Sequence, residues 1–269
     1  MGSYLRFMRK FFLSAAAYCL IAIFPASAQT PTQEYLVGAT LYTQNAAEYR
    51  ALCYQAYNLA ELRLLEALRS NPARPAVILD LDETVLDNSA YTGWQIQHDQ
   101  PYTPETWARW TELADAALVP GAARFLHLAD SLGVTLLYVS NRLEIERDAT
   151  LRNMLAHGLP QVQPEHFFLK SSSSDKTERR AAITSAGYNI LLLIGDNLGD
   201  FDGQWEKQTN ALRNERADAV RDLFGSRYIV LPNAIYGTWE GALYKFNWNA
   251  TPVERDSLRR AGLRGVELE

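Results

Sequence analysis

The sequence predicts an α/β fold: a Rossmann-like, three-layer arrangement in which helices cover both faces of a parallel sheet. Short, continuous apolar runs at residues 76–80, 134–139 and 190–194 are typical of strands buried on both faces. Segments with apolar residues at helical spacing separate these runs, and that alternation predicts parallel strands joined by helical crossovers. A length of 269 residues suits one such domain with insertions, or two small ones.

The first 28 residues have the pattern of a secretory signal peptide. Basic residues precede an apolar stretch at 11–24, and small residues at positions 26 and 28 form a cleavage pattern. Cys19 would be the lipidated residue of a lipoprotein, but Tyr18 before it fits a lipidation site poorly. We therefore expect a periplasmic or secreted protein without a lipid anchor or stable membrane insertion; an uncleaved membrane anchor is the alternative.

Charge and cysteine content exclude several classes of protein. The net charge of the whole chain is −5, and loss of a basic leader would make it more acidic. No basic stripe is present, so we expect no nucleic-acid partner. Outside the leader, Cys53 is the one cysteine, so the exported chain would have no internal disulfide. Its place in an apolar helical pattern predicts a core position.

Before the second strand, the sequence predicts an N-terminal helical segment and an insertion. Within residues 29–75, apolar residues recur at alternating spacings of three and four over 40–69, which predicts one long amphipathic helix. Strand 76–80 follows and begins the core, which we expect to occupy residues 76–269. Residues 88–120 are rich in aromatics, contain no strand-like run, and include a helix start at Thr103-Pro104. We interpret them as a small, mainly helical cap over the strand end.

The remaining elements alternate regularly. Helices are expected from Pro120 to near Gly133, over 144–157, from Asp175 to Gly187, and from Thr251 at the C-terminus. The strands between them are expected at 134–139, 167–169, 190–194 and 228–231.

Polar side chains follow three of the predicted strands, where the chain leaves the sheet. They are Asp80 and Asp82, then Ser140 and Asn141, then Asp196 and Asp200. Parallel strands bring these ends to one edge of the sheet, where ligands bind in open α/β folds. Carboxylates so close together repel one another, and Mg²⁺ removes that conflict while also binding phosphate oxygens.

Lys176, near a predicted helix start, and Ser140 favour a phosphate at the same edge. The set therefore predicts Mg²⁺-assisted phosphoryl transfer through an aspartyl-phosphate.

Four stretches, in this order, resemble the four signatures of the haloacid dehalogenase (HAD) superfamily. They are residues 80–84 (Asp-Leu-Asp-Glu-Thr), Ser140, Lys176, and residues 195–201 (Gly-Asp-Asn-Leu-Gly-Asp-Phe). A finer resemblance, carried by 80–91 and 195–201, is to the bacterial class C acid phosphatases. Residues 44–49 and 231–237 are also similar to that family, so the resemblance spans nearly all of the chain after residue 28. Class B acid phosphatases, with Asp at position 83 in place of Glu83, fit less well.

The resemblance implies a HAD-like core and a role for each of these residues. Asp80 would be the nucleophile, and Asp82 the general acid and then the general base. Mg²⁺ would lie on Asp80, the backbone carbonyl of Asp82, and Asp196, with Asp200 as a further ligand or a support.

Ser140 and Lys176 would bind the transferring phosphoryl oxygens, and Asn141 would add a backbone donor. Trp94 and Tyr236 are candidates to stack on an aromatic leaving group, although each is equally consistent with packing. Arg142 is as consistent with an internal ion pair as with a substrate contact.

The sequence thus predicts a secreted acid phosphatase for small phosphomonoesters such as nucleoside monophosphates and aryl phosphates. Two alternatives remain: a phosphotransferase of the same superfamily, and a non-catalytic phosphate-ligand binding or storage protein on the same fold. Retention of Asp80 argues against the latter. A homodimer is compatible with the sequence.

Overall fold

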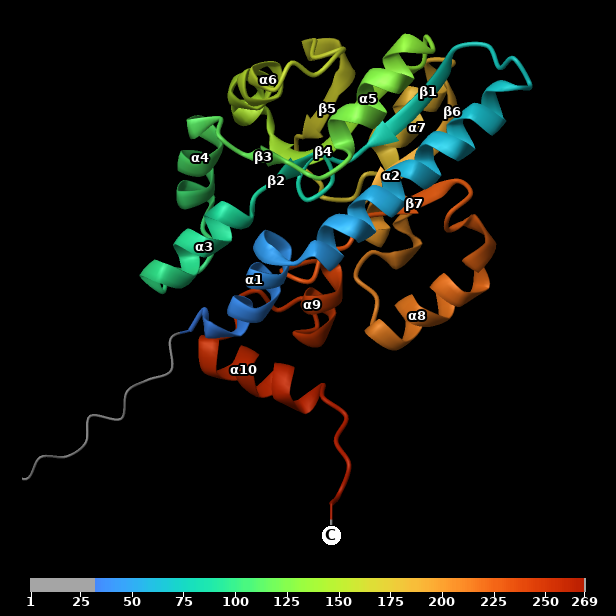
Figure 1. The fold of residues 1–269 in the computed structure, drawn as a ribbon. Helices are drawn as coiled ribbons and strands as arrows, with labels where there is room; N and C mark the ends of the chain where they lie inside the picture. The colour runs from blue at the N-terminus through green and yellow to red at the C-terminus, as the bar shows by residue number, and fades with distance from the viewer. Residues whose placement is uncertain (1–31, 269) are drawn as a thin grey trace, which may run out of the picture. The chain divides into compact units, whose positions relative to one another are not determined.

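The computed structural model describes residues 32–268, so the predicted signal peptide lies outside the described residues. Within them, a five-stranded parallel sheet has the order β5-β4-β1-β6-β7 (Figure 1). Its strands are β1 (Pro75–Leu79), β4 (Thr135–Leu143), β5 (Phe167–Lys170), β6 (Asn189–Gly195) and β7 (Tyr228–Val230). The parallel sheet confirms the predicted fold class.

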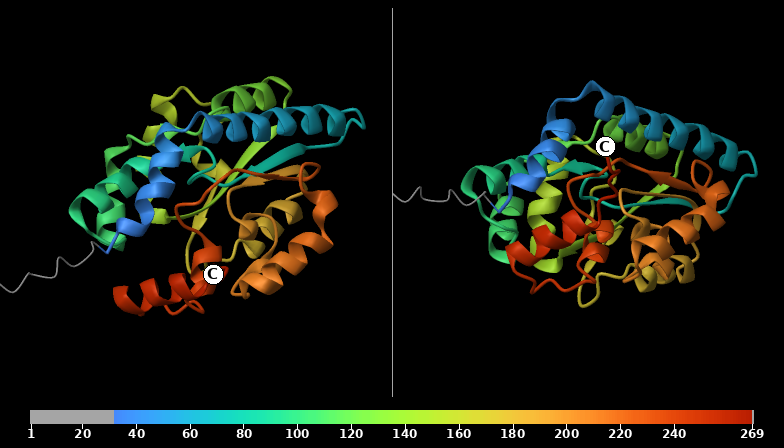
Figure 2. Two further views of the ribbon diagram at one scale, coloured as in Figure 1. Left: turned by 60° about the horizontal axis from the view of Figure 1, so that its bottom comes forward. Right: turned by 90° about the horizontal axis from the view of Figure 1, so that it is seen from below.

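Helices cover both faces of this sheet. The helices are α1 (Val37–Asn45), α2 (Ala47–Leu68), α3 (Ser89–His98), α4 (Pro104–Leu113), α5 (Ala122–Ser131), α6 (Arg147–Ala156), α7 (Thr177–Ser185), α8 (Asn210–Ala219), α9 (Thr238–Leu243) and α10 (Pro252–Ala261). Helices α2 and α5 pack together on one face, and α7 lies on the other (Figure 2). The result is the three-layer arrangement that the sequence predicts.

Each central strand contributes to two separate cores, because successive side chains point to opposite faces. In β1, Val77 and Leu79 join the core beneath α2 and α5, where Cys53 is also fully buried as expected. Ala76 and Ile78 join the core that contains Ile183 of α7. Burial on both faces explains why the strand is continuously apolar.

The order of the strands creates a switch point beside β1. The chain runs from β1 outward to β4 and β5, then returns to place β6 on the other side of β1. Connections from β1 and β6 therefore leave in opposite directions, which opens a crevice at their carboxyl ends. Asp80 follows β1 and Asp196 follows β6, so the crevice lies between two of the predicted site residues.

The insertion after β1 is mainly helical, as expected. It contains α3 and α4, between the short strands β2 (Leu86–Asp87) and β3 (Ala117–Leu118). These two strands pair antiparallel and close the insertion at its base. The sequence shows no strand-like run there, because a two-residue strand is too short to produce a hydrophobic period.

The prediction of one helix over 40–69 was wrong in one respect. The chain breaks at Ala46, whose ψ of 128° is extended, and so separates α1 from α2. After the break α2 packs on α5 and the sheet, whereas α1 contacts α3 of the insertion, where the Gln44 amide donates to the Ser89 carbonyl at 3.0 Å. Apolar spacing continues through the bend, so periodicity alone does not reveal it.

Helices α8 and α9 were not predicted.

The final helix begins as expected, with a capping box between Thr251 and Glu254. Among the helices that the structure describes, none combines the length and apolar character needed to cross a membrane.

Candidate active site

A tight loop after β1 presents Asp80 and Asp82. The amide of Asp80 donates to the Ile194 carbonyl of β6 at 2.9 Å, which extends the sheet pairing by one residue. The Leu81 carbonyl then accepts from the amides of Val85 and Leu86, each at 2.8 Å, so the chain turns back at once. Glu83 lies in this turn with a φ of 59°, a left-handed conformation uncommon for a side chain larger than glycine.

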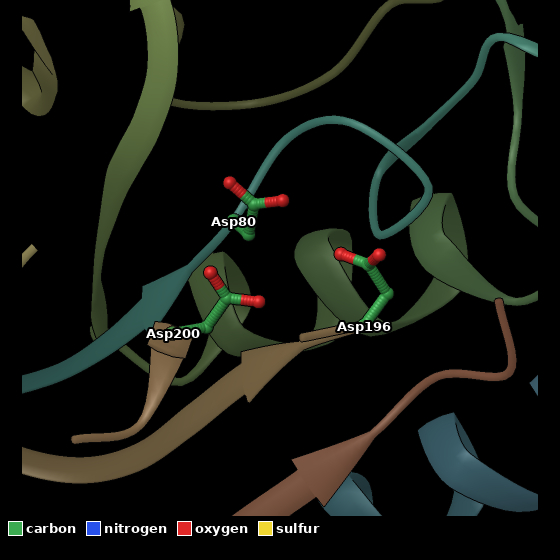
Figure 3. A group of neighbouring side chains, drawn as sticks. All are labelled: Asp80, Asp196 and Asp200. Atoms are coloured by element: carbon green, nitrogen blue, oxygen red, sulfur yellow. The ribbon is translucent and has the colours of Figure 1, made fainter. Parts of the chain in front are cut away.

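Three carboxylates converge at the crevice between β1 and β6. Asp80, Asp196 and Asp200 each offer an oxygen atom, and these atoms all lie within 4.8 Å of one another (Figure 3). Asp200 belongs to the 3₁₀ turn η4 (Leu198–Asp200) that follows β6. The structure thus brings together three of the residues predicted to bind the metal.

Lys176 lies immediately before α7 and is buried in the same group. Its ammonium donates to Asp80 Oδ1 and, at 2.7 Å, to Asp200 Oδ1. The start of α7 is fixed by Asp175, whose carboxylate accepts from the Thr177 amide at 2.8 Å. The lysine is therefore held in contact with Asp80, the candidate nucleophile.

Neighbouring side chains and a glycine hold the carboxylates in place. Asp196 Oδ2 accepts from the side-chain amide of Asn233 at 2.8 Å, and the Thr84 hydroxyl lies 3.4 Å from Asp196 Oδ1. Asp200 Oδ2 accepts from the backbone N–H of Asn197 at 2.9 Å. A β-carbon added to Gly195 would overlap the Asp200 side chain, so a glycine is required for Asp200 to lie against the end of β6.

Burial strongly affects ionisation in this group. It raises the pKa of Asp80 to about 7, although the Lys176 ammonium acts in the opposite direction. Burial, and then the charges of Asp200 and Asp80, raise the pKa of Asp196 well above its usual range. For Lys176 burial alone would lower the pKa, but the carboxylates of Asp200 and Asp80 outweigh it and raise the pKa. One ammonium cannot offset three ionised carboxylates, so full ionisation would leave an excess of negative charge among them.

The donor set fits a hard divalent cation. All of its candidate ligand atoms are carboxylate oxygens, which Mg²⁺ prefers over nitrogen or sulfur, and the excess negative charge is what a cation would offset. The side chain of Asp82 is not part of this group of three carboxylates.

Asp82 is bound instead by Arg142 and Asn88. Arg142 forms an ion pair with Asp82 Oδ1 at 2.8 Å, and the Asn88 amide donates to the same oxygen at 2.9 Å. The ion pair is one of the two roles that the sequence left open for Arg142. Arg142 and Asn88 are buried, whereas Asp82 is half-buried.

Ser140 and Asn141 lie where β4 leaves its regular pairing with β5. The register between these strands shifts between Val139 and Leu143. Ser140 is fully buried, and its hydroxyl accepts from the Arg142 amide at 3.1 Å. Arg179 of α7 donates to the Ser140 carbonyl and, at 2.7 Å, to Asn141 Oδ1. These contacts fix the β4 end beside α7.

The two predicted aromatic contacts have different surroundings. Trp94 stacks on Tyr91 and His98 within the insertion, with ring centroids 6.0 and 5.0 Å away. Tyr236 donates its hydroxyl to the buried carboxyl group of Glu83, which ties the chain after β7 to the loop after β1. Burial, together with the charges of Asp82 and Asp196, raises the pKa of Glu83 well above its usual range.

Sequence reasoning missed the supporting residues Asn88, Asn233, Arg179 and Glu83. Each acts through a partner distant in sequence or across a turn, so spacing carries no signal for it. Asn233 lies in the stretch 231–237, and Glu83 and Asn88 lie in the stretch 80–91. Both stretches carry the family resemblance, which was the available signal.

Comparison with known families supports one assignment. The family model described as HAD superfamily, subfamily IIIB (Acid phosphatase), matches residues 13–239. The structure is similar to the class C acid phosphatase from Bacillus anthracis, with a TM-score of 0.85 and 37% identity. That match covers 88% of this chain and 100% of the other. A crystal structure of the Bacillus anthracis enzyme with tungstate bound matches equally well.

Two plant proteins are more distantly similar. The stem 28 kDa glycoprotein of Glycine max is 24% identical over 218 residues, which cover 79% of this chain and 75% of the glycoprotein. A stem 31 kDa glycoprotein of the same plant is 23% identical over 220 residues, covering 79% of this chain and 72% of its own length.

Proposed function

This chain belongs to the class C acid phosphatases of the HAD superfamily, subfamily IIIB, and is therefore a phosphoric monoester hydrolase. We propose that it acts through an aspartyl-phosphate formed on Asp80. The observation that carries the proposal is the position of Asp80. It is buried at the switch point of the sheet, in contact with Lys176 and within a group of carboxylates suited to a cation.

In the first half of the reaction, an Asp80 carboxylate oxygen attacks phosphorus and the bond from phosphorus to the leaving oxygen breaks. Asp82 donates its proton to that oxygen, which departs as an alcohol. Lys176 lies beside Asp80 and Ser140 is on the neighbouring strand end, so both are suited to bind the oxygens of the transferring group.

In the second half, Asp82 takes a proton from a water molecule, and the water oxygen attacks phosphorus. The bond between phosphorus and Asp80 breaks, inorganic phosphate is released, and both aspartates return to their starting states. Since Asp82 must begin protonated, we expect the rate to be greatest in mildly acidic buffer.

We assign Mg²⁺ to Asp80, Asp196 and the backbone carbonyl of Asp82, with Asp200 as a further ligand or a support. When bound, a divalent cation offsets the carboxylate charges and polarises the phosphoryl oxygens. Asn233 and Thr84 would orient Asp196 for that purpose, as outer partners of metal ligands commonly do.

We further propose small phosphomonoesters, including nucleoside monophosphates and aryl phosphates, as substrates. The similar Bacillus anthracis enzyme binds tungstate, a tetrahedral oxyanion like phosphate, which supports an oxyanion site here. Trp94 and Tyr236 are candidates to contact the leaving group. The leader pattern of residues 1–28 supports export to the periplasm or beyond.

The test is hydrolysis of p-nitrophenyl phosphate and a panel of nucleoside monophosphates, with Mg²⁺ or with EDTA, by the wild type and Asp80→Asn. We expect metal-dependent turnover in the wild type and loss of turnover in the variant. Turnover that persists in a folded Asp80→Asn protein would exclude Asp80 as the nucleophile.

A further inference from the structure

The carboxylate of Asp82 is held by one of its two oxygens. Arg142 Nε donates to Oδ1 at 2.9 Å, Arg142 Nη2 lies 2.8 Å from the same atom, and the Asn88 amide donates to it at 2.9 Å. Within residues 32–268, the hydrogen bonds to this carboxylate all end on Oδ1.

Arg142 is itself fixed. Its side chain is 1% exposed, and Nη1 donates to the Thr150 hydroxyl at 3.0 Å. That hydroxyl in turn donates to the Glu146 carbonyl at 2.8 Å, so the guanidinium is anchored to α6. A planar guanidinium with two nitrogens on one oxygen and a third on α6 fixes the position of the carboxylate oxygen that it contacts.

Asn88 connects the same oxygen to the insertion. Trp110 Nε1, which can only donate, lies 2.8 Å from Asn88 Oδ1. The contact fixes the orientation of the Asn88 side chain, so its NH₂ group must face Asp82. Trp110 belongs to α4, and the position of the carboxylate is therefore coupled to the insertion above the crevice.

From this geometry we infer that Arg142 and Asn88 are positioning residues. They occupy Asp82 Oδ1 and leave Oδ2 to transfer the proton, and Trp110 links Asn88 to the insertion. The inference rests on the proposed function of Asp82. An oxygen that already accepts several N–H groups has no room for a proton, so the acid proton resides on Oδ2. It passes from Oδ2 to the leaving oxygen, and Oδ2 later takes the proton of the attacking water.

The consequence depends on the leaving group. A benzyl alkoxide is strongly basic and needs the proton as the bond to phosphorus breaks, whereas p-nitrophenolate departs without one. Loss of the contacts that hold Asp82 should therefore slow the hydrolysis of benzyl phosphate much more than that of p-nitrophenyl phosphate. A general loss of structure would slow both esters alike.

The test is kcat/KM of the wild type, Arg142→Lys and Asn88→Ala for both esters at saturating Mg²⁺. For Arg142→Lys we expect a loss of about 10- to 100-fold on benzyl phosphate and no more than about threefold on p-nitrophenyl phosphate, in line with general acid catalysis. Asn88→Ala should change the ratio of the two kcat/KM values, benzyl phosphate to p-nitrophenyl phosphate, in the same direction by a smaller factor. Because it leaves the ion pair intact, it keeps the inference testable if Arg142→Lys does not fold.

Arg213→Lys is the matched control. Arg213 is also buried, and it donates to the Trp205 carbonyl at 2.7 Å, outside the carboxylate group. We expect its ratio of the two rates to equal that of the wild type. Equal losses on both esters in folded Arg142→Lys and Asn88→Ala would overturn the inference while leaving the phosphatase mechanism intact. If wild type turns over neither ester, it is the proposed function that fails.

Discussion

At the scale of single residues, the site depends on a buried lysine shared by two carboxylates. Lys176 contacts Asp80 and Asp200, and all three side chains are buried. Removing one partner of a buried ion pair leaves an uncompensated charge, which is strongly destabilising. The same ammonium is suited to offset charge on the transferring phosphoryl group.

We therefore predict that Lys176→Met lowers kcat for p-nitrophenyl phosphate by about 100-fold or more. Its melting temperature in EDTA should also fall, because the carboxylates lose their nearest cation. Lys207→Met, at an exposed position, is the control and should match the wild type in both measurements. A kcat within about threefold of the wild type would show that Lys176 has no catalytic role.

Gly195 provides a second prediction at this scale. A β-carbon there would overlap Asp200, so Gly195→Ala must displace either that side chain or the end of β6. We expect a lower affinity for Mg²⁺ and a large loss of activity, measured by titrating Mg²⁺ against turnover. Gly133→Ala is a less crowded comparison, since its added β-carbon meets nothing within 4 Å, although a φ of 71° strains it. Wild-type Mg²⁺ dependence in Gly195→Ala would contradict this reading of the contact.

Several of these residues could be predicted from the sequence, and the reason is physical. Asp80, Asp196 and Ser140 each lie at or near the end of a continuous apolar run of the sequence, and parallel strands must end at one edge of the sheet. Lys176 was predicted from its order and its place near a helix start. Asn88 and Asn233 could not be found in this way, because hydrogen bonds to Asp82 and Asp196 across folded loops leave no periodic pattern.

At the scale of elements, helix α2 directly supports the loop that follows β1. The hydroxyl of Tyr57 donates to the Thr84 carbonyl at 2.6 Å, in a fully buried setting. Thr84 lies two residues after Asp82, and its own hydroxyl is near Asp196. The bond therefore links the helical layer to the loop that holds Asp80 and Asp82, the two aspartates that we propose to be catalytic.

Tyr57→Phe removes this bond and leaves a buried carbonyl without its partner. We expect a loss of about 1–3 kcal/mol in the free energy of unfolding. For a domain of this size, that corresponds to a fall of roughly 2–4 °C in melting temperature per kcal/mol. Tyr54→Phe on the exposed face of the same helix is the control and should change stability little. Calorimetry that finds the two variants equally stable would contradict the supporting role.

The fold class, the sheet strands and most helices were predictable at this scale, because their apolar periods are long and regular. The break between α1 and α2 was not, since apolar spacing persists across Ala46. The β2–β3 pair was missed because its strands have only two residues each.

At the scale of the whole molecule, the excess negative charge at the crevice should link stability to pH and metal. In the metal-free protein burial raises the pKa of Asp80 to about 7, whereas in the unfolded chain it is about 4. Between these values the folded state binds more protons than the unfolded state. The contribution of Asp80 to stability must therefore fall as pH rises through this window.

Asp80→Asn isolates that contribution, because the amide approximates the protonated acid in shape. In EDTA, we expect the melting temperature of the variant, relative to the wild type, to increase between about pH 5 and about pH 7.5. In saturating Mg²⁺ the wild type should have the higher melting temperature, because Mg²⁺ stabilises the ionised wild-type site by mass action. A difference in melting temperature that stays constant with pH in EDTA would contradict the assigned origin of the shift.

The proposed function places the phosphoryl group on Asp80. Its most direct test is to quench turnover of p-nitrophenyl phosphate in acid within the first catalytic cycles and to examine the peptides by mass spectrometry. We predict the added mass of one phosphoryl group on the peptide that contains Asp80, and no such addition in Asp80→Asn. A phosphoryl group on a different residue would exclude Asp80 as the nucleophile.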